Sequence, residues 1–273
     1  MSNDQRGHAA KAAPGDRNER PAGWFAVVLA IVTTTAIVAV AIAAPLLVEV
    51  FRGLAPGGVT DLPPPGGSPS AIRSGWWHLV AFQTTCIVLA VLMADQLRRD
   101  TAARLAWRPP SGRLSWVWPF IVTTLVSLFV AAVALTYYPE VVARDLEPIR
   151  QMVSAGPLWL AFLALAVGAP ISEELLFRGF LLQRLKVTPL GFWGGALVAN
   201  IGWTALHVGY SWLSLADVFT AGLLFSWALW RTGSIWVPIA FHAIYNAVVF
   251  FIMLIPEQGA TAVTATAHSL APW

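Results

Sequence analysis

The chain has 273 residues, of which 57% are hydrophobic and only 11% are charged, and its net charge is +3 at pH 7. A soluble domain usually carries about 25% charged residues, because its surface has to be polar. This composition therefore excludes an ordinary water-soluble globule. The one cysteine, Cys86, excludes a disulfide framework and a cysteine-based metal site. The small net charge gives no basic surface for nucleic acid.

Residues 1–22 are polar, carry charges of both signs and predict a disordered tail. Seven apolar runs follow, each near the roughly 20 residues that a helix needs to cross a bilayer. They cover residues 24–51, 76–93, 116–137, 158–182, 192–208, 213–230 and 235–254. The sequence thus predicts an all-α, polytopic transmembrane helical bundle with about seven spans. An eighth is expected if Pro170 breaks the fourth run.

We divide the chain into four parts: the tail (1–22), N-terminal transmembrane helices (23–157), a region rich in intramembrane polar groups (158–254) and a short C-terminal tail (255–273). Lys and Arg are enriched in the first tail, in the segment from Arg98 to Arg113, near Arg178–Lys186 and at Arg231. The alternate connections are poorer in them. Under the positive-inside rule, this pattern predicts a multi-pass cell-membrane protein with a cytoplasmic N-terminus and an external C-terminus.

A charged cluster lies in the fourth run, where Glu173, Glu174 and Arg178 interrupt apolar sequence. A charge at a helix centre costs about 2.5–3.5 kcal/mol, so these groups need partners. Glu174 and Arg178 are four residues apart, share a helix face and can form an ion pair. Glu173 is turned by about 100° from Glu174, and its carboxylate is therefore available for another role.

Two later runs each carry a second polar face. Asn200, Trp203 and His207 are spaced to share one face of the fifth run, and His242 and Asn246 share one face of the last. Each group alone fits a packing role or an interhelical hydrogen bond. Together, a free carboxylate, two histidines and an amide supply a base, an acid and oxyanion donors. We expect them to face one another inside the bundle.

These three motifs, Glu-Glu-x-x-x-Arg at 173–178, Trp-x-x-x-His at 203–207 and His-x-x-x-Asn at 242–246, resemble those of the CPBP family. That family comprises the CAAX-prenyl-protease and bacteriocin-processing intramembrane proteases, also called Abi or type II CAAX endopeptidases. The resemblance covers about residues 158–250 and includes Ala169-Pro170. The departure is Trp203, where Phe is usual, which is expected to affect packing more than chemistry.

The resemblance implies an intramembrane endopeptidase that acts on a membrane-associated peptide, with a prenylated CAAX protein as the family expectation. Glu173, with His207, would activate water. His242 and Asn246 would stabilise the oxyanion, while Glu174 and Arg178 would hold the site in shape. We favour this mechanism without a metal cofactor. In the alternative, Glu173, His207 and His242 would form a zinc site with an open position, although no His-Glu-x-x-His motif is present.

We expect a cytoplasm-facing cavity lined by the fourth, fifth and last spans. The depth of His207 in the bilayer, counted along its helix, fits this cavity poorly. If the helix begins at Phe192, His207 falls near the outer side of the membrane, so we interpret Pro189–Gly195 as an interfacial or re-entrant piece. Two other functions use the same polar groups. One is a catalytically silent membrane scaffold or bacteriocin-immunity factor. The other is a proton-coupled transporter, against which the absence of an inverted sequence repeat argues.

Overall fold

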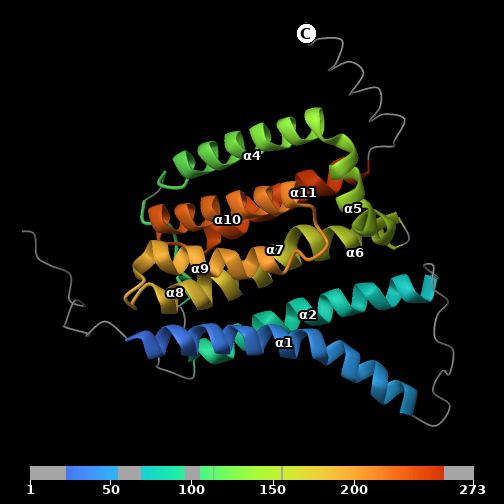
Figure 1. Ribbon diagram of the computed structural model, residues 1–273, viewed down its shortest axis with the longest axis horizontal. Coiled ribbons are helices and arrows are strands. Elements are labelled where there is room, and N and C mark those ends of the chain that lie inside the picture. Colours follow the sequence, from blue (N-terminus) through green and yellow to red (C-terminus); the bar gives the residue numbers. More distant parts are fainter. Residues whose placement is uncertain (1–22, 55–68, 96–104, 113, 155, 255–273) are drawn as a thin grey trace, which may run out of the picture.

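The computed structural model describes residues 23–54, 69–95, 105–112, 114–154 and 156–254, and this part of the chain is helical throughout, with no strand (Figure 1). The expected tails at 1–22 and 255–273 lie outside it. The separate helices are α1 (Trp24–Leu54), α2 (Pro69–Asp95), α4 (Val117–Tyr137), α5 (Pro139–Ser154), α9 (Gly191–Ala205), α10 (Trp212–Thr232) and α11 (Trp236–Met253).

One long helix combines five consecutive elements. They are α6 (Leu158–Phe162), η1 (Leu163–Gly168), α7 (Ala169–Glu173), η2 (Glu174–Leu181) and α8 (Leu182–Leu185), where η marks π-helical turns. The helix continues through Pro170, so the break that would give an eighth span does not occur. The wider π turns before Pro170 accommodate a residue without an N–H, so the chain need not leave the helix.

The predicted fold class is confirmed, and the number of spans needs one refinement. Six of the described helices are long and apolar enough to cross a membrane: Trp24–Leu47, Gly75–Ala94, Val117–Tyr137, Leu158–Leu185, Trp212–Thr232 and Trp236–Met253. The fifth expected span is α9, which has 15 residues. At 1.5 Å per residue it is about 22 Å long, shorter than the ~30 Å hydrocarbon core.

Helix α9 begins at Gly191, after a turn closed by the bond from Gly191 N–H to Thr188 O. Residues 191–195 are its first turn and not a separate re-entrant piece. The helix ends at Ala205, so His207 lies in the connection to α10. This placement removes the misfit in depth, because His207 does not have to lie within a spanning helix.

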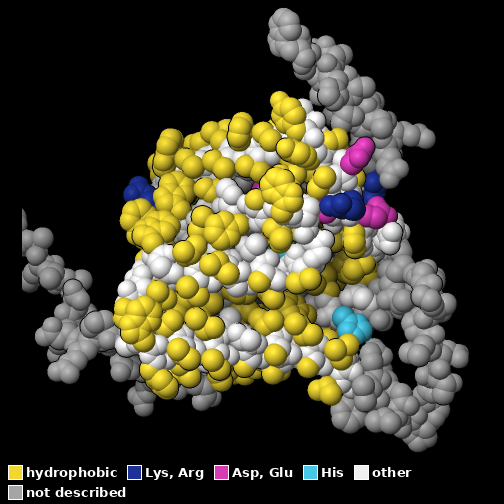
Figure 2. Space-filling model, viewed as in Figure 1, with side chains coloured by type: hydrophobic (Ala, Val, Ile, Leu, Met, Phe, Trp, Pro, Cys, Tyr) yellow, Lys and Arg dark blue, Asp and Glu magenta, His cyan; other side chains and the backbone are white. Residues whose placement is uncertain are grey.

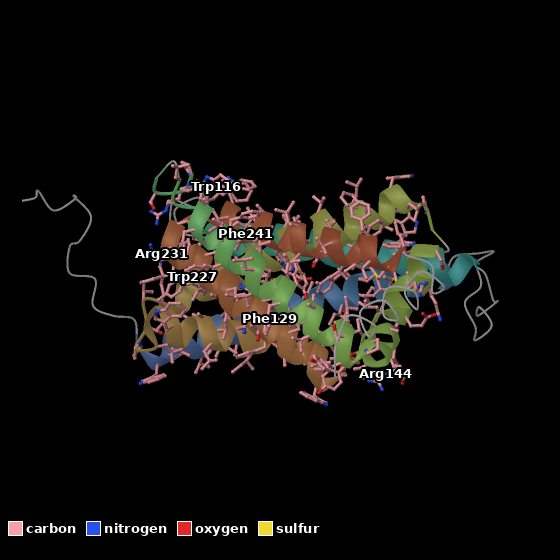
Figure 3. All side chains as sticks on the ribbon, turned by 90° about the horizontal axis from the view of Figure 1, so that it is seen from above. Trp116, Phe129, Arg144, Trp227, Arg231 and Phe241 are labelled. Atoms are coloured by element: carbon pink, nitrogen blue, oxygen red, sulfur yellow. The ribbon has the colours of Figure 1, made fainter. Side chains whose placement is uncertain are left out.

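Helix α5 was not expected from the sequence. It is amphipathic, with charged residues such as Glu140 and Arg144 exposed and Asp145 and Val153 buried. In Figure 3, Arg144 of α5 and Arg231 at the end of α10 lie at opposite ends of the bundle. Helix α5 therefore caps the end remote from the basic connection at Arg231.

The outer surface of the bundle is largely apolar (Figure 2), with side chains such as Trp24, Phe25 and Phe129 exposed. Its interior contains small residues, including Ala161, Ala196 and Ala228. Small side chains let helices approach closely in a membrane, where hydrophobic association offers little driving force. The distribution is that of a bundle surrounded by lipid.

Candidate active site

A buried ion pair lies at the centre of the bundle. Arg178 Nη1 donates to Glu174 Oε1 at 3.0 Å, and both side chains are fully buried. His242 Nδ1 lies 3.0 Å from the same Glu174 oxygen, which joins α11 to the long helix. The expected pairing of Glu174 with Arg178 is confirmed. An isolated charge here would be costly, so each partner needs the other.

The guanidinium is held by three further contacts. Arg178 Nη2 donates to Asn200 Oδ1 at 3.3 Å and to Gly222 O at 3.1 Å, and its Cζ lies 4.4 Å from the centroid of the Trp203 ring. A Cβ built at Gly222 would overlap Asn200 and crowd both Arg178 and Trp203. Glycine at position 222 therefore creates the space in which α9, α10 and the long helix meet.

Glu173 faces a different direction, as the helical geometry predicted. Its side chain is 20% exposed, against 0% for Glu174, and it lines a cavity inside the bundle. Trp203 Nε1 donates to Glu173 Oε2 at 2.5 Å. His242 Nε2 lies 3.9 Å from that oxygen. Of the two glutamates, Glu173 is the one that can reach a bound molecule.

His207 lies on the cavity wall, next to Trp203. Its Nδ1 is 3.1 Å from the backbone oxygen of Trp203. A carbonyl can only accept, so Nδ1 carries the proton and Nε2 of the neutral ring is the acceptor. The ring also packs edge-on against Trp203 and Tyr210, with centroids 5.2 and 5.5 Å away. The contact with the Trp203 carbonyl thus orients the imidazole at the cavity wall.

Asn246 lines the same cavity and uses one amide hydrogen within the protein. Its Nδ2 donates to Leu165 O at 2.9 Å. In a π turn this carbonyl would accept from the residue five positions later, which is Pro170 and has no N–H. Asn246 therefore satisfies an acceptor that the proline leaves open. The second amide hydrogen is available to the cavity, because a carboxamide nitrogen has two donors.

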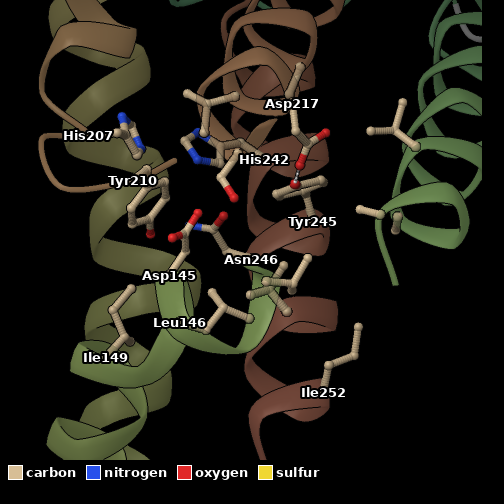
Figure 4. Close-up of a pocket in the computed structure, with 18 of the residues that line it drawn as sticks. Asp145, Leu146, Ile149, His207, Tyr210, Asp217, His242, Tyr245, Asn246 and Ile252 are labelled. Atoms are coloured by element: carbon tan, nitrogen blue, oxygen red, sulfur yellow. Dashed lines mark hydrogen bonds between the residues drawn. The ribbon is translucent and has the colours of Figure 1, made fainter. Parts of the chain in front are cut away.

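The cavity has a volume of about 400 Å³ and is lined by more elements than the three predicted spans. Figure 4 shows side chains from α5, α10 and α11 around it, together with His207 and Tyr210 of the connection to α10. The sequence analysis missed five polar residues at this site: Asp145, Tyr210, Ser214, Asp217 and Tyr245. Tyr245 and Asp217 are spaced 28 residues apart, and their hydrogen bond gives no local signal in the sequence.

Asp145 fastens α5 to the connection before α10. Its Oδ2 accepts from the Ser211 N–H at 2.9 Å. Burial alone would raise the pKa of Asp145, but hydrogen bonds from Ser211, Ser214 and Arg144 outweigh it and hold the pKa below its ordinary value. Burial and the nearby carboxylates of Glu173 and Asp145 raise the pKa of Tyr210. At neutral pH Asp145 is charged and Tyr210 is a neutral hydroxyl.

The lining shows in which direction the cavity extends within the bundle. From Glu173 and His242 it extends toward α5, Tyr210 and Met253, the end opposite Arg231 (Figure 3). The orientation predicted from the charge pattern would put that end outside the cell. The predicted orientation and the expectation of a cytoplasm-facing cavity therefore cannot both hold, and the orientation stays a prediction.

The three residues of the alternative zinc set all line the cavity. Within the described ranges, no three His, Cys, Asp or Glu side chains are grouped so that they could hold one metal ion. His242 Nδ1 is engaged by Glu174 and its Nε2 lies 3.9 Å from Glu173, while Nδ1 of His207 is directed to the Trp203 backbone. In this arrangement Glu173, His207 and His242 do not form a three-ligand site.

Comparison with known proteins gives one family-model match, and it covers the region of the site. Residues 155–248 match the family model described as "Type II CAAX prenyl endopeptidase Rce1-like". This segment contains all three polar motifs. It begins three residues before the expected boundary at 158.

Two curated proteins illustrate the similarity. The chain is 27% identical over 203 residues to "Putative membrane peptidase YdiL" of Bacillus subtilis (strain 168), covering 71% of this chain and 79% of that protein. It is 35% identical over 85 residues to "Uncharacterized 24.3 kDa protein" of Escherichia coli, covering 30% of this chain and 39% of the other. No solved structure matches the chain. Together with the six long apolar helices of the described residues, these matches support a multi-pass membrane protein.

Proposed function

We propose that this chain hydrolyses a peptide bond in a membrane-associated substrate. The Rce1-like match and the YdiL relative support its membership of the CPBP family of intramembrane proteases. The observation that carries the proposal is the separation of the two adjacent glutamates. Glu174 is fully buried and paired with Arg178, whereas Glu173 lines the cavity. One carboxylate is thus available for chemistry in an apolar site.

In the proposed reaction, Glu173 is the general base. It accepts a proton from a water molecule, whose oxygen attacks the carbonyl carbon of the scissile bond. The carbonyl π bond breaks and an oxyanion forms. The proton then passes to the leaving nitrogen, the C–N bond breaks, and a carboxylic acid and an amine are released. A positioned base of this kind contributes roughly 10²–10⁴-fold in rate.

The other polar groups have supporting roles in this scheme. His207, with Nε2 as an acceptor beside the cavity, assists Glu173 by accepting a hydrogen bond from the water and so orienting it. The free amide hydrogen of Asn246 donates to the oxyanion, where preorganised donors stabilise charge as it develops. His242 does so through Nε2 when its ring carries both protons, because its Nδ1 faces Glu174. Glu174 and Arg178 keep His242 in place through the bond to Nδ1. No step requires a metal ion.

The substrate is proposed to be a peptide with an apolar or lipidated segment. Most of the cavity lining is apolar and includes Leu79, Phe129, Leu146, Ile149 and Val249. An apolar group that binds against this wall leaves water, and its burial stabilises the complex by about 25 cal/mol per Å² of apolar surface. A prenylated CAAX protein fits this chemistry and the family description.

The test is cleavage by the purified full chain in detergent or liposomes. The substrates are fluorogenic peptides with and without a farnesyl group. We expect hydrolysis by the wild type and its loss in Glu173→Gln, with Glu140→Gln as the matched control because Glu140 is exposed on α5. Absence of any cleavage across both substrate types, from a folded wild type, would favour the silent scaffold instead.

A further inference from the structure

We propose that Gln83 of α2 is a positioning residue: its carboxamide holds the π turn before Pro170 and so directs Glu173 into the cavity. The proposal rests on the proposed function for the role of Glu173. Gln83 lies outside residues 155–248, the segment that matches the family. It would make the N-terminal helices part of the catalytic apparatus.

The first observation is the hydrogen bonding of two consecutive carbonyls in η1. Leu165 O accepts from Asn246 Nδ2, and Ala164 O accepts from Gln83 Nε2, both at 2.9 Å. Ala164 O also accepts from the Ala169 N–H, the i to i+5 bond of a π turn. Side chains from α11 and α2 thus fasten the widened turn from two sides.

The second observation is the fit of Gln83 against the long helix. The Gln83 side chain is 5% exposed. A Cβ built at Gly168 would overlap Gln83 Oε1 and crowd its Cδ. The space occupied by the carboxamide therefore exists only because residue 168 has no side chain. Gln83 and Gly168 are complementary, 85 positions apart in the chain.

The consequence for Glu173 follows from helical geometry. Each residue advances an α-helix by about 100°, and a π turn contains one more residue than an α turn. If the turn at 163–168 tightened to α geometry, the residues after it would rotate by about that angle relative to those before it. Glu173 follows this turn by five residues, so its direction depends on the turn staying wide. A buried polar side chain that satisfies the turn supplies that constraint.

The test begins with a readout that is independent of proteolysis. Glu173→Cys is introduced together with Cys86→Ala, because Cys86 is the one native thiol. The rate at which a small charged methanethiosulfonate modifies the new cysteine at position 173 is then measured. Adding Gln83→Met, which keeps the length but removes the donor, is expected to change this rate severalfold. Thr84→Val is the control, because Thr84 is exposed on the same helix and should leave the rate unchanged.

The second readout is the kinetics of the chain with Glu173 intact. Gln83→Met is expected to lower kcat by roughly 10²-fold or more, because a misplacement of only about 1 Å can already cost that much. KM and the unfolding temperature should be little changed. Gly168→Ala should act in the same direction, because it displaces the carboxamide without removing it. Should one variant not fold, the other provides the same comparison.

Unchanged labelling and unchanged kcat in folded Gln83→Met would overturn the proposal. Equal losses of kcat, substrate binding and folded fraction would also overturn it, because Gln83 would then be merely structural. If the wild type cleaves no peptide, the proposed function fails, while the labelling rates still decide the role of Gln83.

Discussion

Trp203 Nε1 donates a 2.5 Å hydrogen bond to Glu173 Oε2, so the indole of α9 fixes the carboxylate that lines the cavity. The same ring lies 4.4 Å from Arg178 Cζ and packs edge-on against His207 and His242. Phenylalanine, usual at this position of the motif, could provide the ring contacts but not the hydrogen bond. The departure at Trp203 therefore concerns the chemistry of the site as well as its packing.

Trp203→Phe tests this contact. We expect the variant to fold, because an aromatic ring remains against Arg178. Its kcat should fall by roughly 10- to 150-fold, which corresponds to about 1.5–3 kcal/mol for one hydrogen bond to a charged group. Steady-state kinetics on the peptide substrate measure the loss. Trp193→Phe is the matched control, since Trp193 is also on α9 but 48% exposed. Equal kcat in wild type and Trp203→Phe would show that the bond has no role in catalysis.

The two glutamates should respond differently to the same substitution. Glu173→Gln is expected to fold and to be inactive, because a carboxamide cannot act as a base. Glu174→Gln leaves Arg178 without its charged partner and should lower the free energy of unfolding by about 3–5 kcal/mol. Denaturant unfolding in mixed micelles and cleavage assays on both variants provide the comparison. Near-wild-type cleavage by Glu173→Gln would mean that another group is the base.

Asp145 should contribute stability that depends on pH. Its pKa is lowered in the folded chain, so the contribution is present above the unfolded value of about 4 and is lost as the pH falls through the folded value. At neutral pH, Asp145→Ala is expected to cost about 1.5–3 kcal/mol, typical of hydrogen bonds to a charged group. The difference between wild type and variant should shrink in acid. A difference that is the same at all pH values would contradict this linkage.

Removal of metal distinguishes the metal-free mechanism based on Glu173 from the zinc alternative. In the zinc alternative the ion generates the nucleophile, so stripping it would abolish turnover, and His242→Ala would lose bound metal. We expect activity to survive dialysis against a strong chelator and elemental analysis to find no stoichiometric zinc. Asn246→Ala should still lower the rate by about 10²–10³-fold, as for an oxyanion donor. Activity lost on chelation and restored by zinc would establish the metal mechanism.

Reporter fusions test the orientation and the side to which the cavity extends. A reporter at the C-terminus should register as extracytoplasmic and one placed after Arg104 as cytoplasmic, as the distribution of Lys and Arg predicts. The cavity would then extend toward the outer face, where α5 lies. A cysteine at Arg144, exposed on α5, should accordingly react with a membrane-impermeant reagent in whole cells. Reaction only after lysis would place α5 in the cytoplasm.

The sequence by itself determined the features that depend on local spacing. Apolar length identified the six described helices that are long enough to cross a membrane, although it also predicted a seventh at α9. The four-residue spacing of Glu174 and Arg178 predicted their ion pair, because i and i+4 share a helix face wherever the helix is placed. The turn of about 100° between Glu173 and Glu174 likewise predicted that one glutamate would be free of that pair. These relationships need no knowledge of the neighbouring helices.

Only the tertiary structure decided what depends on contacts between distant segments. The bond from Trp203 to Glu173 and the bridge from His242 to Glu174 span 30 and 68 positions, and no periodicity encodes them. The polar pattern of α5 predicted neither a spanning helix nor a site, yet Asp145 reaches the cavity through packing. Pro170 suggested a break, but amides from α2 and α11 satisfy the turn before it. The tendency of Pro170 to break the helix was overridden, because side chains from distant segments supplied hydrogen bonds to the carbonyls of this turn.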